Sequence, residues 1–446
     1  MFKMKTITLS LLALLLVMSF ASCASDTTSD LPLPSKDMKA YLQVKVTVEG
    51  SGDTRASRAT TGRPQGGEDG NGREPGINHE NDVNSLTVLL YKSGKEDLSE
   101  ADATIDYVYT FTNLNKVTTS SGSDATYTTV PREIDASIVG KNYHVIVIAN
   151  ADDMTSRCKG KISEVRDLQM SKVCTRDADI TNFSNFIMSS KTDAMIDFTK
   201  EGSETDPYVV NVDIERLAAR IDIIPNATYV DTDKGYYYNV MDGTNVVGGF
   251  KLESVTPTKV MTKGEYLIKR VSSDKTVPSV TYFGLETKDA DNKATNYVVC
   301  PWTKDRTGLT LAEAEGPASL YNVKKTTVGE ASYILDYVME NTTTNNAEDY
   351  STGLIFKGKY YESSEWNATT KKPKAGFAGA EKQYTYTLRH SDPSGNGTTA
   401  DPMHFGVVRN NIYQVKVEGV EGKSKGIKLT IHVVPWAHYD HGEVIY

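Results

Sequence analysis

Cysteine is scarce in this sequence: only four of the 446 residues are cysteines. Apart from Cys23 near the N-terminus, Cys158, Cys174 and Cys300 form an odd set without CxxC spacing, which supports neither a disulfide framework nor a zinc site. If the chain between Cys158 and Cys174 were helical, the two sulfurs would be roughly 24 Å apart at ~1.5 Å per residue, beyond disulfide reach. We therefore expect all three thiols to be buried or unpaired.

The common catalytic and cofactor motifs are also absent from the sequence. It has no GxSxG elbow, no Walker A loop and no HExxH helix, and its seven histidines are spread out, so no Ser/His/Asp set can be assembled. His438, Asp440 and His441 are close in sequence, but zinc or copper normally needs three or four ligands with defined spacing. We therefore expect no catalytic residue, no metal site and no cofactor.

The basic residues do not gather into a stripe. The 49 lysines and arginines are scattered and are outnumbered by 58 aspartates and glutamates, which gives a net charge of −9. Nucleic acid binds to clustered positive charge, so it is not an expected partner. A hydrophobic fraction of 39% is sufficient for folded cores, and the length allows two or three domains.

The N-terminus has the layout of an export signal. Two lysines begin it, an apolar run follows over residues 9–17, and small residues precede Cys23. The run is too short to span a bilayer as a stable helix, and no later apolar stretch is long enough. Residues 20–23 resemble the lipobox of bacterial lipoproteins, although Leu, Val or Ile is usual in place of Phe20. This resemblance implies removal of residues 1–22 and acylation of Cys23. The alternative is an ordinary secretory signal with a chance cysteine.

The clearest strand follows a polar tether over residues 24–37. Residues 41–49 alternate strictly, and four apolar side chains share one face: Leu42, Val44, Val46 and Val48. The next segment, 50–82, is rich in Gly, Asp, Arg and Pro and has almost no hydrophobic residue. We expect it to be exposed, mobile and open to proteases.

Beyond this linker, short alternating or β-branched segments are separated by clusters of Gly, Asn, Asp and Thr. They predict strands at Leu86–Tyr91, Tyr143–Ile148, Val209–Ile214, Arg220–Ile224, Tyr297–Cys300, Tyr384–Leu388, Tyr413–Val417 and Ile427–Val433. Helical spacing predicts one helix at Ile162–Met170. Because there is no βαβ rhythm, an all-β sandwich is favoured over a parallel sheet. The best candidate for a domain boundary lies around residues 201–212.

The C-terminal segment repeats the spacing of the first strand. Its apolar residues stand at every second position: Ile427, Leu429, Ile431 and Val433. Lys428, Thr430 and His432 occupy the other face, so the two strands could fit the same kind of groove. Pro435 cannot donate to a ladder and ends the run, and Glu443–Tyr446 could add a shorter strand. The alternative is that both segments are permanent strands, since alternation is typical of any half-buried strand.

Four segments in a fixed order carry a family resemblance. They are Val83–Tyr91, Val145–Ala151, Glu215–Ile221 and Val408–Tyr413. Together with the lipobox and an early arginine-containing linker, they resemble the major fimbrial subunits of Bacteroidales, the FimA-like fimbrillin family that builds type V pili. The segments span most of the chain after residue 83, but residues 226–400 contain no matching motif.

The resemblance implies a lipoprotein precursor at the outer membrane surface, folded as two transthyretin-like β-sandwich domains. It also implies that an arginine-specific protease cuts after the first strand, and that a C-terminal strand of another subunit fills the opened groove. We expect the cut between Arg55 and Ala56, because Arg55 is the first arginine after the strand; Arg58 is the alternative. The expected regions are the signal peptide (1–22), a propeptide (23–55), an N-terminal domain (56–211) and a C-terminal domain with the donor strand (212–446).

The expected function is a fimbrial shaft subunit that supports adhesion and has no catalytic activity. The expected partners are other copies of the chain, accessory tip and anchor subunits, the protease, and the outer membrane through the lipid of the precursor. Cleavage would leave Cys23 behind, so subunits in the fimbria should carry no lipid. Two alternatives are a monomeric surface-anchored adhesin or glycan-binding lipoprotein, and an exported hydrolase whose site the sequence does not reveal.

Overall fold

The computed structural model describes residues 39–48, 78–92, 103–117, 125–166, 168–176, 183–191, 194–199, 202–227, 229–231, 235–258, 260–261, 264–267, 297–298, 333–342, 352–389, 406–422 and 426–435. Strands dominate this part of the chain, as the sequence predicts. Its helices are short: η2 (Asn78–Asn81), η3 (Ala136–Ile138) and α2 (Ile162–Arg166).

The first large sheet is built from the N-terminal half of the chain. Its strand order is β4 (Leu114–Val117), β5 (Ala125–Thr129), β1 (Ala40–Val48), β14 (Tyr208–Arg216), β12 (Met188–Ser190), β7 (Asn142–Ala149), β2 (Leu86–Tyr91), β3 (Thr104–Phe111) and β8 (Gly160–Lys161). Two further strands join it, β6 (Arg132–Ile134) on β1 and β13 (Ala194–Asp197) on β7. The first strand of the chain therefore lies inside this sheet.

The second large sheet is built from the C-terminal half. Its order is β22 (Tyr333–Met339), β15 (Ala218–Ile224), β29 (Asn411–Glu421), β17 (Gly235–Asp242), β18 (Asn245–Thr258), β24 (Gly353–Glu362) and β27 (Ala380–Thr387). In addition, β16 (Tyr229–Asp231) pairs with β17 and β30 (Gly426–Pro435) with β29.

Short two-stranded pairs complete the described structure. They are β10 (Thr175–Arg176) with β11 (Phe183–Ser184), β19 (Val260–Met261) with β21 (Tyr297–Val298), β9 (Gln169–Met170) with β20 (Gly264–Glu265), β23 (Asn341–Thr342) with β28 (Gly406–Val407), and β25 (Trp366–Asn367) with β26 (Lys372–Pro373). The β9–β20 pair joins a segment of each half of the chain.

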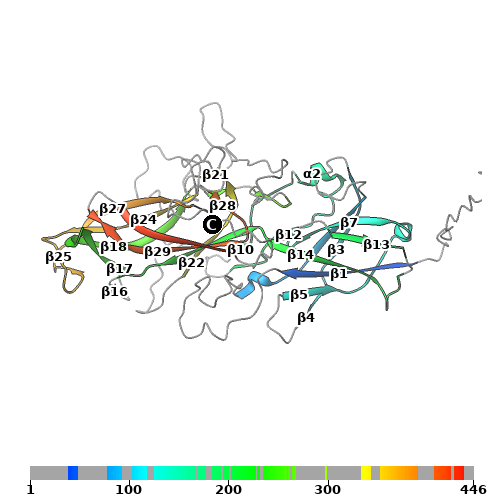
Figure 1. The fold of residues 1–446 in the computed structure, drawn as a ribbon, viewed down its shortest axis with the longest axis horizontal. Helices are drawn as coiled ribbons and strands as arrows, with labels where there is room; N and C mark the ends of the chain where they lie inside the picture. The colour runs from blue at the N-terminus through cyan, green and yellow to red at the C-terminus, as the bar shows by residue number, and fades with distance from the viewer. Residues whose placement is uncertain are drawn as a thin grey trace, which may run out of the picture.

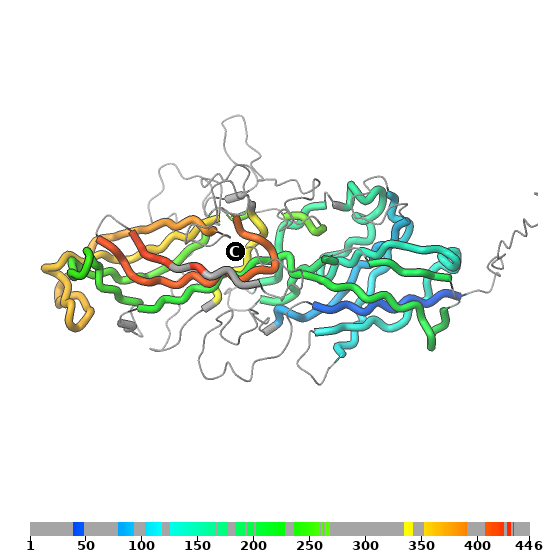
Figure 2. The backbone as a smooth tube through the Cα atoms, viewed as in Figure 1, coloured from blue at the N-terminus to red at the C-terminus, as the bar shows by residue number. Residues whose placement is uncertain are grey.

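Each large sheet encloses its own hydrophobic core, so the expected all-β architecture of two sandwich domains is confirmed. The two domains lie end to end along the long axis of the molecule (Figure 1). The backbone trace shows the blue first strand within one domain and the orange and red C-terminal strands within the other (Figure 2). Met261, Tyr266 and Met339 of the C-terminal half pack into the first core and link the domains.

The chain changes sheets at Leu217, because β14 ends at Arg216 and β15 begins at Ala218. The boundary expected between residues 211 and 212 therefore lies within β14. The polar segment that suggested it contains a turn of the first domain, in which the Ser203 N–H donates to the Asp206 carbonyl at 3.0 Å.

The helix predicted at Ile162–Met170 is only partly correct. α2 ends at Arg166, and Gln169 and Met170 form β9 instead. The cause is long-range, because Met170 pairs with Gly264 and Gln169 with Glu265. A partner nearly a hundred residues away in sequence overrides local helical spacing. The predicted strand at Tyr297–Cys300 is present as β21, while residues 299–300 lie outside the described ranges.

Two of the cysteines are free and buried, as expected: Cys158 and Cys174. Burial raises the pKa of the Cys158 thiol to about 11 and that of the Cys174 thiol to about 12. Both groups are therefore protonated and unreactive near neutral pH. Cys23 and Cys300 lie outside the described residues.

Candidate functional site

The first strand, β1, is enclosed by partner strands along both edges. It runs parallel to β14, from Leu42 opposite Tyr208 to Val48 opposite Ile214. On its other edge it is antiparallel to β5 along its C-terminal half and to β6 along its N-terminal end. An inner strand of this kind cannot leave without exposing unpaired backbone groups on two neighbours.

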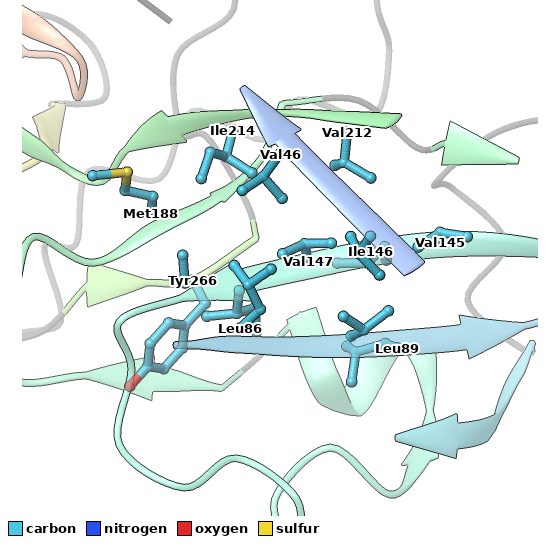
Figure 3. Packing of buried hydrophobic residues seen from close by; sticks show 14 of the residues in the cluster. Val46, Leu86, Leu89, Val145, Ile146, Val147, Met188, Val212, Ile214 and Tyr266 are labelled. Atoms are coloured by element: carbon cyan, nitrogen blue, oxygen red, sulfur yellow. The ribbon is translucent and has the colours of Figure 1, made fainter. Parts of the chain in front are cut away.

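The core face of β1 is completely buried. Its alternate residues, which include the four predicted ones, are each 0% exposed: Ala40, Leu42, Val44, Val46 and Val48. Figure 3 shows Val46 among Ile214, Val212 and Val147. At ~1.5 to 3 kcal/mol each, burying the four larger side chains contributes on the order of 6 to 12 kcal/mol before ordering costs. The removal of β1 by proteolysis stays a prediction.

The wall formed by β5 and β6 contains a bulge. Lys45 lies opposite Thr128 of β5, whereas Leu42 lies opposite Arg132 of β6. Two residues of β1 therefore face three residues of the wall, 129–131. Such bulges interrupt a ladder and re-aim a side chain.

Thr129 occupies this bulge and bonds directly to β1. Its Oγ1 accepts a hydrogen bond from the Val44 N–H at 2.9 Å, and its carbonyl accepts one from Gln43 Nε2 at 2.9 Å. Thr129 is 0% exposed, and its bond to Val44 is buried, whereas its bond to Gln43 is partly buried. The side-chain hydroxyl thus replaces the missing backbone partner of β1.

The segment 78–85 is bound to both domains. Its first part belongs to the 50–82 stretch that we expected to be exposed and mobile, but Glu80 and Asn81 are buried, so that expectation is wrong from residue 78 on. The Glu80 carboxylate accepts hydrogen bonds from Arg220 Nη1 and from the Tyr337 hydroxyl, both in the C-terminal domain. The Glu80 carbonyl accepts a hydrogen bond from Arg216 Nε at 2.9 Å. Cleavage anywhere before residue 78 would therefore leave this anchorage intact.

Charges at this junction are paired away from water. Arg220 lies between Glu80 and Asp222, and all three are at most 1% exposed. Burial alone lowers the pKa of Arg220, but Asp222 and Glu80 outweigh it and hold that pKa above its ordinary value. Burial raises the pKa of Asp222 against the attraction of Arg220. The guanidinium is thus the cation that makes two buried carboxylates tolerable.

The same segment touches the groove wall. Tyr127 of β5, opposite Val46, donates a hydrogen bond from its hydroxyl to Asp82 Oδ1 at 3.5 Å. Burial raises the pKa of Tyr127 to about 12, and the Asp82 carboxylate adds to the shift. The segment 78–85 therefore connects the groove wall, through Asp82, with the interdomain junction, through Glu80.

The predicted donor strand is present as β30. It pairs antiparallel with β29, from Val417 opposite Leu429 to Asn411 opposite Pro435. In the described part of the chain, β29 is the strand against which it lies. Ile431 is 4% exposed, and Ile427 and Leu429 are half-buried. Leaving this position would break one ladder, whereas β1 is held by two.

The other residues singled out in the sequence lie outside the described ranges: Cys23, Arg55, Ala56, Arg58, His438, Asp440 and His441. Across the described residues, no three His, Cys, Asp or Glu side chains lie together as metal ligands would. In the same part of the chain, no helix is both long and apolar enough to cross a membrane.

Sequence reasoning missed Thr129, Glu80 and the arginines that bind it. Thr129 is one of several threonines in a polar stretch, and no local pattern distinguishes it. Arg216 and Arg220 stand within a segment used for the family resemblance, so their position in an apolar strand could have indicated buried ion pairs.

Residues 40–216 match the family model described as "Major fimbrial subunit protein (FimA)". No curated protein sequence matches the chain.

Several solved structures are similar at low identity. The tip fimbrial protein Mfa3 from Porphyromonas gingivalis with C-terminal truncation is 14% identical, with a TM-score of 0.40, over 89% of this chain and 100% of that one. A putative cell adhesion protein from Parabacteroides distasonis is 17% identical, with a TM-score of 0.44, over 91% and 100%. A fimbrial assembly protein from the same species is 11% identical, with a TM-score of 0.37, over 89% and 99%.

The matched region begins at the first residue of β1 and ends at the last residue of β14, so it contains the strand and both walls of its groove. Residues 40–216 of this chain are therefore similar to the major fimbrial subunit (FimA) family over the part of the fold that holds the first strand.

Proposed function

We propose that this protein is a structural subunit of a cell-surface fimbria that supports adhesion. It is exported as a lipoprotein precursor, cleaved after an arginine and polymerised by strand exchange. The observation that carries the proposal is the place of β1. This strand is integral to the first domain, with five side chains that are 0% exposed, yet in sequence it stands between a lipobox tether and an arginine-containing linker.

Loss of β1 creates a strong acceptor. The edges of β14 and of β5 with β6 would present unpaired N–H and C=O groups around an apolar trough, which is a template for a strand of matching pattern. Because burial of the missing side chains is worth on the order of 6 to 12 kcal/mol, an empty groove would not persist.

The chain carries a matching donor. The apolar residues of β30 have the same two-residue spacing as those of β1, and β30 lies against β29 on one edge. A strand held by one ladder leaves its own domain at lower cost than an inner strand. The donor groups are Ile427, Leu429, Ile431 and Val433.

The position of the linker explains how cleavage leads to assembly. A cut after Arg55, or after Arg58, separates Cys23 and β1 from the rest of the chain, so the lipid stays with the discarded segment. Before the cut, the lipid holds the precursor at the outer membrane. After the cut, the subunit joins the fimbria. A subunit with both a removable strand and a donor strand suits the shaft, whereas an anchor need not lose its strand and a tip need not donate one.

The test uses the purified precursor and an arginine-specific protease. We expect filaments by electron microscopy and ladders on unboiled denaturing gels, with a new N-terminus at Ala56 or just beyond Arg58. The matched control replaces Arg55, Arg58, Arg63 and Arg73 with lysine, which keeps the charge but removes the cleavage sites; it should stay monomeric.

A second variant tests the donor. Deletion of residues 427–446 should abolish assembly while the cleaved protein stays folded by circular dichroism. Clipped monomers of the unaltered protein that bind glycans would favour the surface-anchored adhesin, and turnover of a chromogenic ester or glycoside would favour the hydrolase. Fimbriae whose subunits begin upstream of Ala56 would contradict the cleavage step.

A further inference from the structure

The groove wall contains a bulge between β5 and β6. Wall residues on either side of it pair regularly with β1, up to Thr128 opposite Lys45 and from Arg132 opposite Leu42. Within the bulge, Pro131 has no N–H to donate, and the Val130 side chain is 49% exposed. Of the three residues in the bulge, Thr129 is the one whose bonds to β1 are described above.

We propose that Thr129 is a positioning residue that sets the register of any strand in this groove. We further propose that the C-terminal strand of a second copy enters in the direction of β1, with Lys428 in the place of Gln43 and Leu429 in the place of Val44. This inference rests on the proposed function, because it assumes that β1 is exchanged for β30.

The two hydrogen bonds of Thr129 define what the incoming strand must supply. At the position of Val44 it needs a backbone N–H for Thr129 Oγ1, which Leu429 provides. At the position of Gln43 it needs a long side chain that donates to the Thr129 carbonyl, which the Lys428 ammonium provides. Because the first bond is buried and the second is partly buried, a strand that lacks either donor is disfavoured.

In this register the apolar side chains also match. Ile427, Leu429, Ile431 and Val433 take the places of Leu42, Val44, Val46 and Val48, respectively.

The neighbouring registers are less favourable for identifiable reasons. A shift by one residue turns the apolar face away from the core. A shift by two in one direction places Lys425 at the position of Leu42, in the middle of the buried face. A shift by two in the other direction places Thr430 beside the Thr129 carbonyl, where its side chain is too short, and Pro435 at the position of Val48, where it cannot donate.

The test reads the register by disulfide formation between copies. Thr128 lies opposite Lys45, so the proposed register places Thr430 of the incoming strand opposite Thr128. Two double variants, which both keep Lys428, are assembled and oxidised: Thr128→Cys with Thr430→Cys, or with His432→Cys. On non-reducing denaturing gels, T128C/T430C should cross-link about tenfold more than T128C/H432C, which is the ratio that one buried hydrogen bond can produce.

Two substitutions of Lys428 test the bond to the Thr129 carbonyl. Registers shifted by two residues all supply a backbone N–H to Thr129 Oγ1, so the side-chain donor at the position of Gln43 is what distinguishes them. Lys428→Met removes that donor and should spread the cross-links between T430C and H432C while filaments still form. Lys428→Gln keeps an N–H donor and should restore the single register. An unchanged cross-link pattern in the Lys428→Met variant would overturn the role of Thr129.

The outcomes separate this inference from the proposed function. Filaments of protein with Thr129 and Lys428 intact that cross-link mainly through H432C, or through neither position, overturn the proposed register. Failure of the unaltered, cleaved protein to form filaments overturns strand exchange itself, whatever the role of Thr129.

Discussion

The Glu80 carboxylate lies against the Arg220 guanidinium, with Nη1 at 3.1 Å from Oε1 and 3.2 Å from Oε2. Glu80 belongs to the segment that enters the first domain after the linker, and Arg220 belongs to the first strand of the second domain. This pair, together with Arg216 on the other side of Leu217, fixes the point at which the chain passes from one domain to the next.

We predict that Arg220→Met destabilises the protein more than Glu80→Gln. Arg220→Met leaves the Glu80 and Asp222 carboxylates buried without the cation between them, which should cost about 3 to 5 kcal/mol. Glu80→Gln leaves the Arg220–Asp222 pair, whose Nη2–Oδ2 distance is 2.9 Å, and should cost only about 1 to 2 kcal/mol. Urea unfolding of each precursor variant measures both values. Equal or reversed costs would show that Arg220 is not the essential cation.

Asn150 offers a second test of the segment that follows the linker. Its side chain makes four hydrogen bonds, accepting from the Asn84 and Ser85 N–H groups and donating to the Asp82 and Phe186 carbonyls. Its φ of 57° is also unfavourable for residues other than Gly, Asn and Asp. We predict that Asn150→Ala lowers the free energy of unfolding by about 3 kcal/mol.

The control for this substitution is Asn226→Ala. Asn226 has a similar φ of 45°, but its side chain makes an exposed contact with Glu418 at 3.4 Å. Asn226→Ala should lower the free energy of unfolding by only about 1 kcal/mol, because of the backbone conformation. If the two variants unfold alike in urea, the hydrogen bonds of Asn150 contribute little.

The two faces of β1 should respond differently to the same charge. Val46 is 0% exposed, so Val46→Asp should cost more than about 3 kcal/mol in the precursor. Lys45 is the neighbouring residue on the exposed face, and Lys45→Asp should change stability by no more than about 0.5 kcal/mol. Thermal and urea unfolding of the uncleaved protein provide the comparison, and a harmless Val46→Asp would mean that β1 contributes little to the first core.

The buried thiols predict a stability that declines in alkali. The pKa values of Cys158 and Cys174 are raised from 9.0 to about 11 and about 12, chiefly by burial. Between pH 9 and 12 the unfolded chain releases these protons while the folded chain retains them. Their contribution is therefore complete below pH 9 and is lost as the pH rises through the folded values.

Thiol labelling provides a direct measurement of the same burial. A short pulse of N-ethylmaleimide at pH 8, read by peptide mass spectrometry, should leave Cys158 and Cys174 unmodified in the native protein and modify both in urea. Rapid labelling of either residue in the native state would show that its part of the core opens readily.

The part of the fold that follows from local pattern was predictable. Strict alternation identified β1 and its core face, and β-branched segments identified β2, β7, β14, β15, β29 and β30. A two-residue period states which side chains share a face, but it does not state which strand lies alongside. For that reason the sequence could propose a removable first strand but could not show that it is enclosed by β14 on one edge and by β5 and β6 on the other.

The remaining features depend on contacts between residues far apart in the chain. The end of α2 at Arg166, the passage between domains at Leu217, the Glu80–Arg220 pair and the bond from Val44 to Thr129 all have partners that no local window contains. The amino-acid sequence alone predicts an export signal, a cleavable linker and alternating strands, because each of these depends only on neighbouring residues. Tertiary structure decided which strands enclose the groove and what marks its register, because burial and hydrogen bonding are satisfied only when distant segments meet.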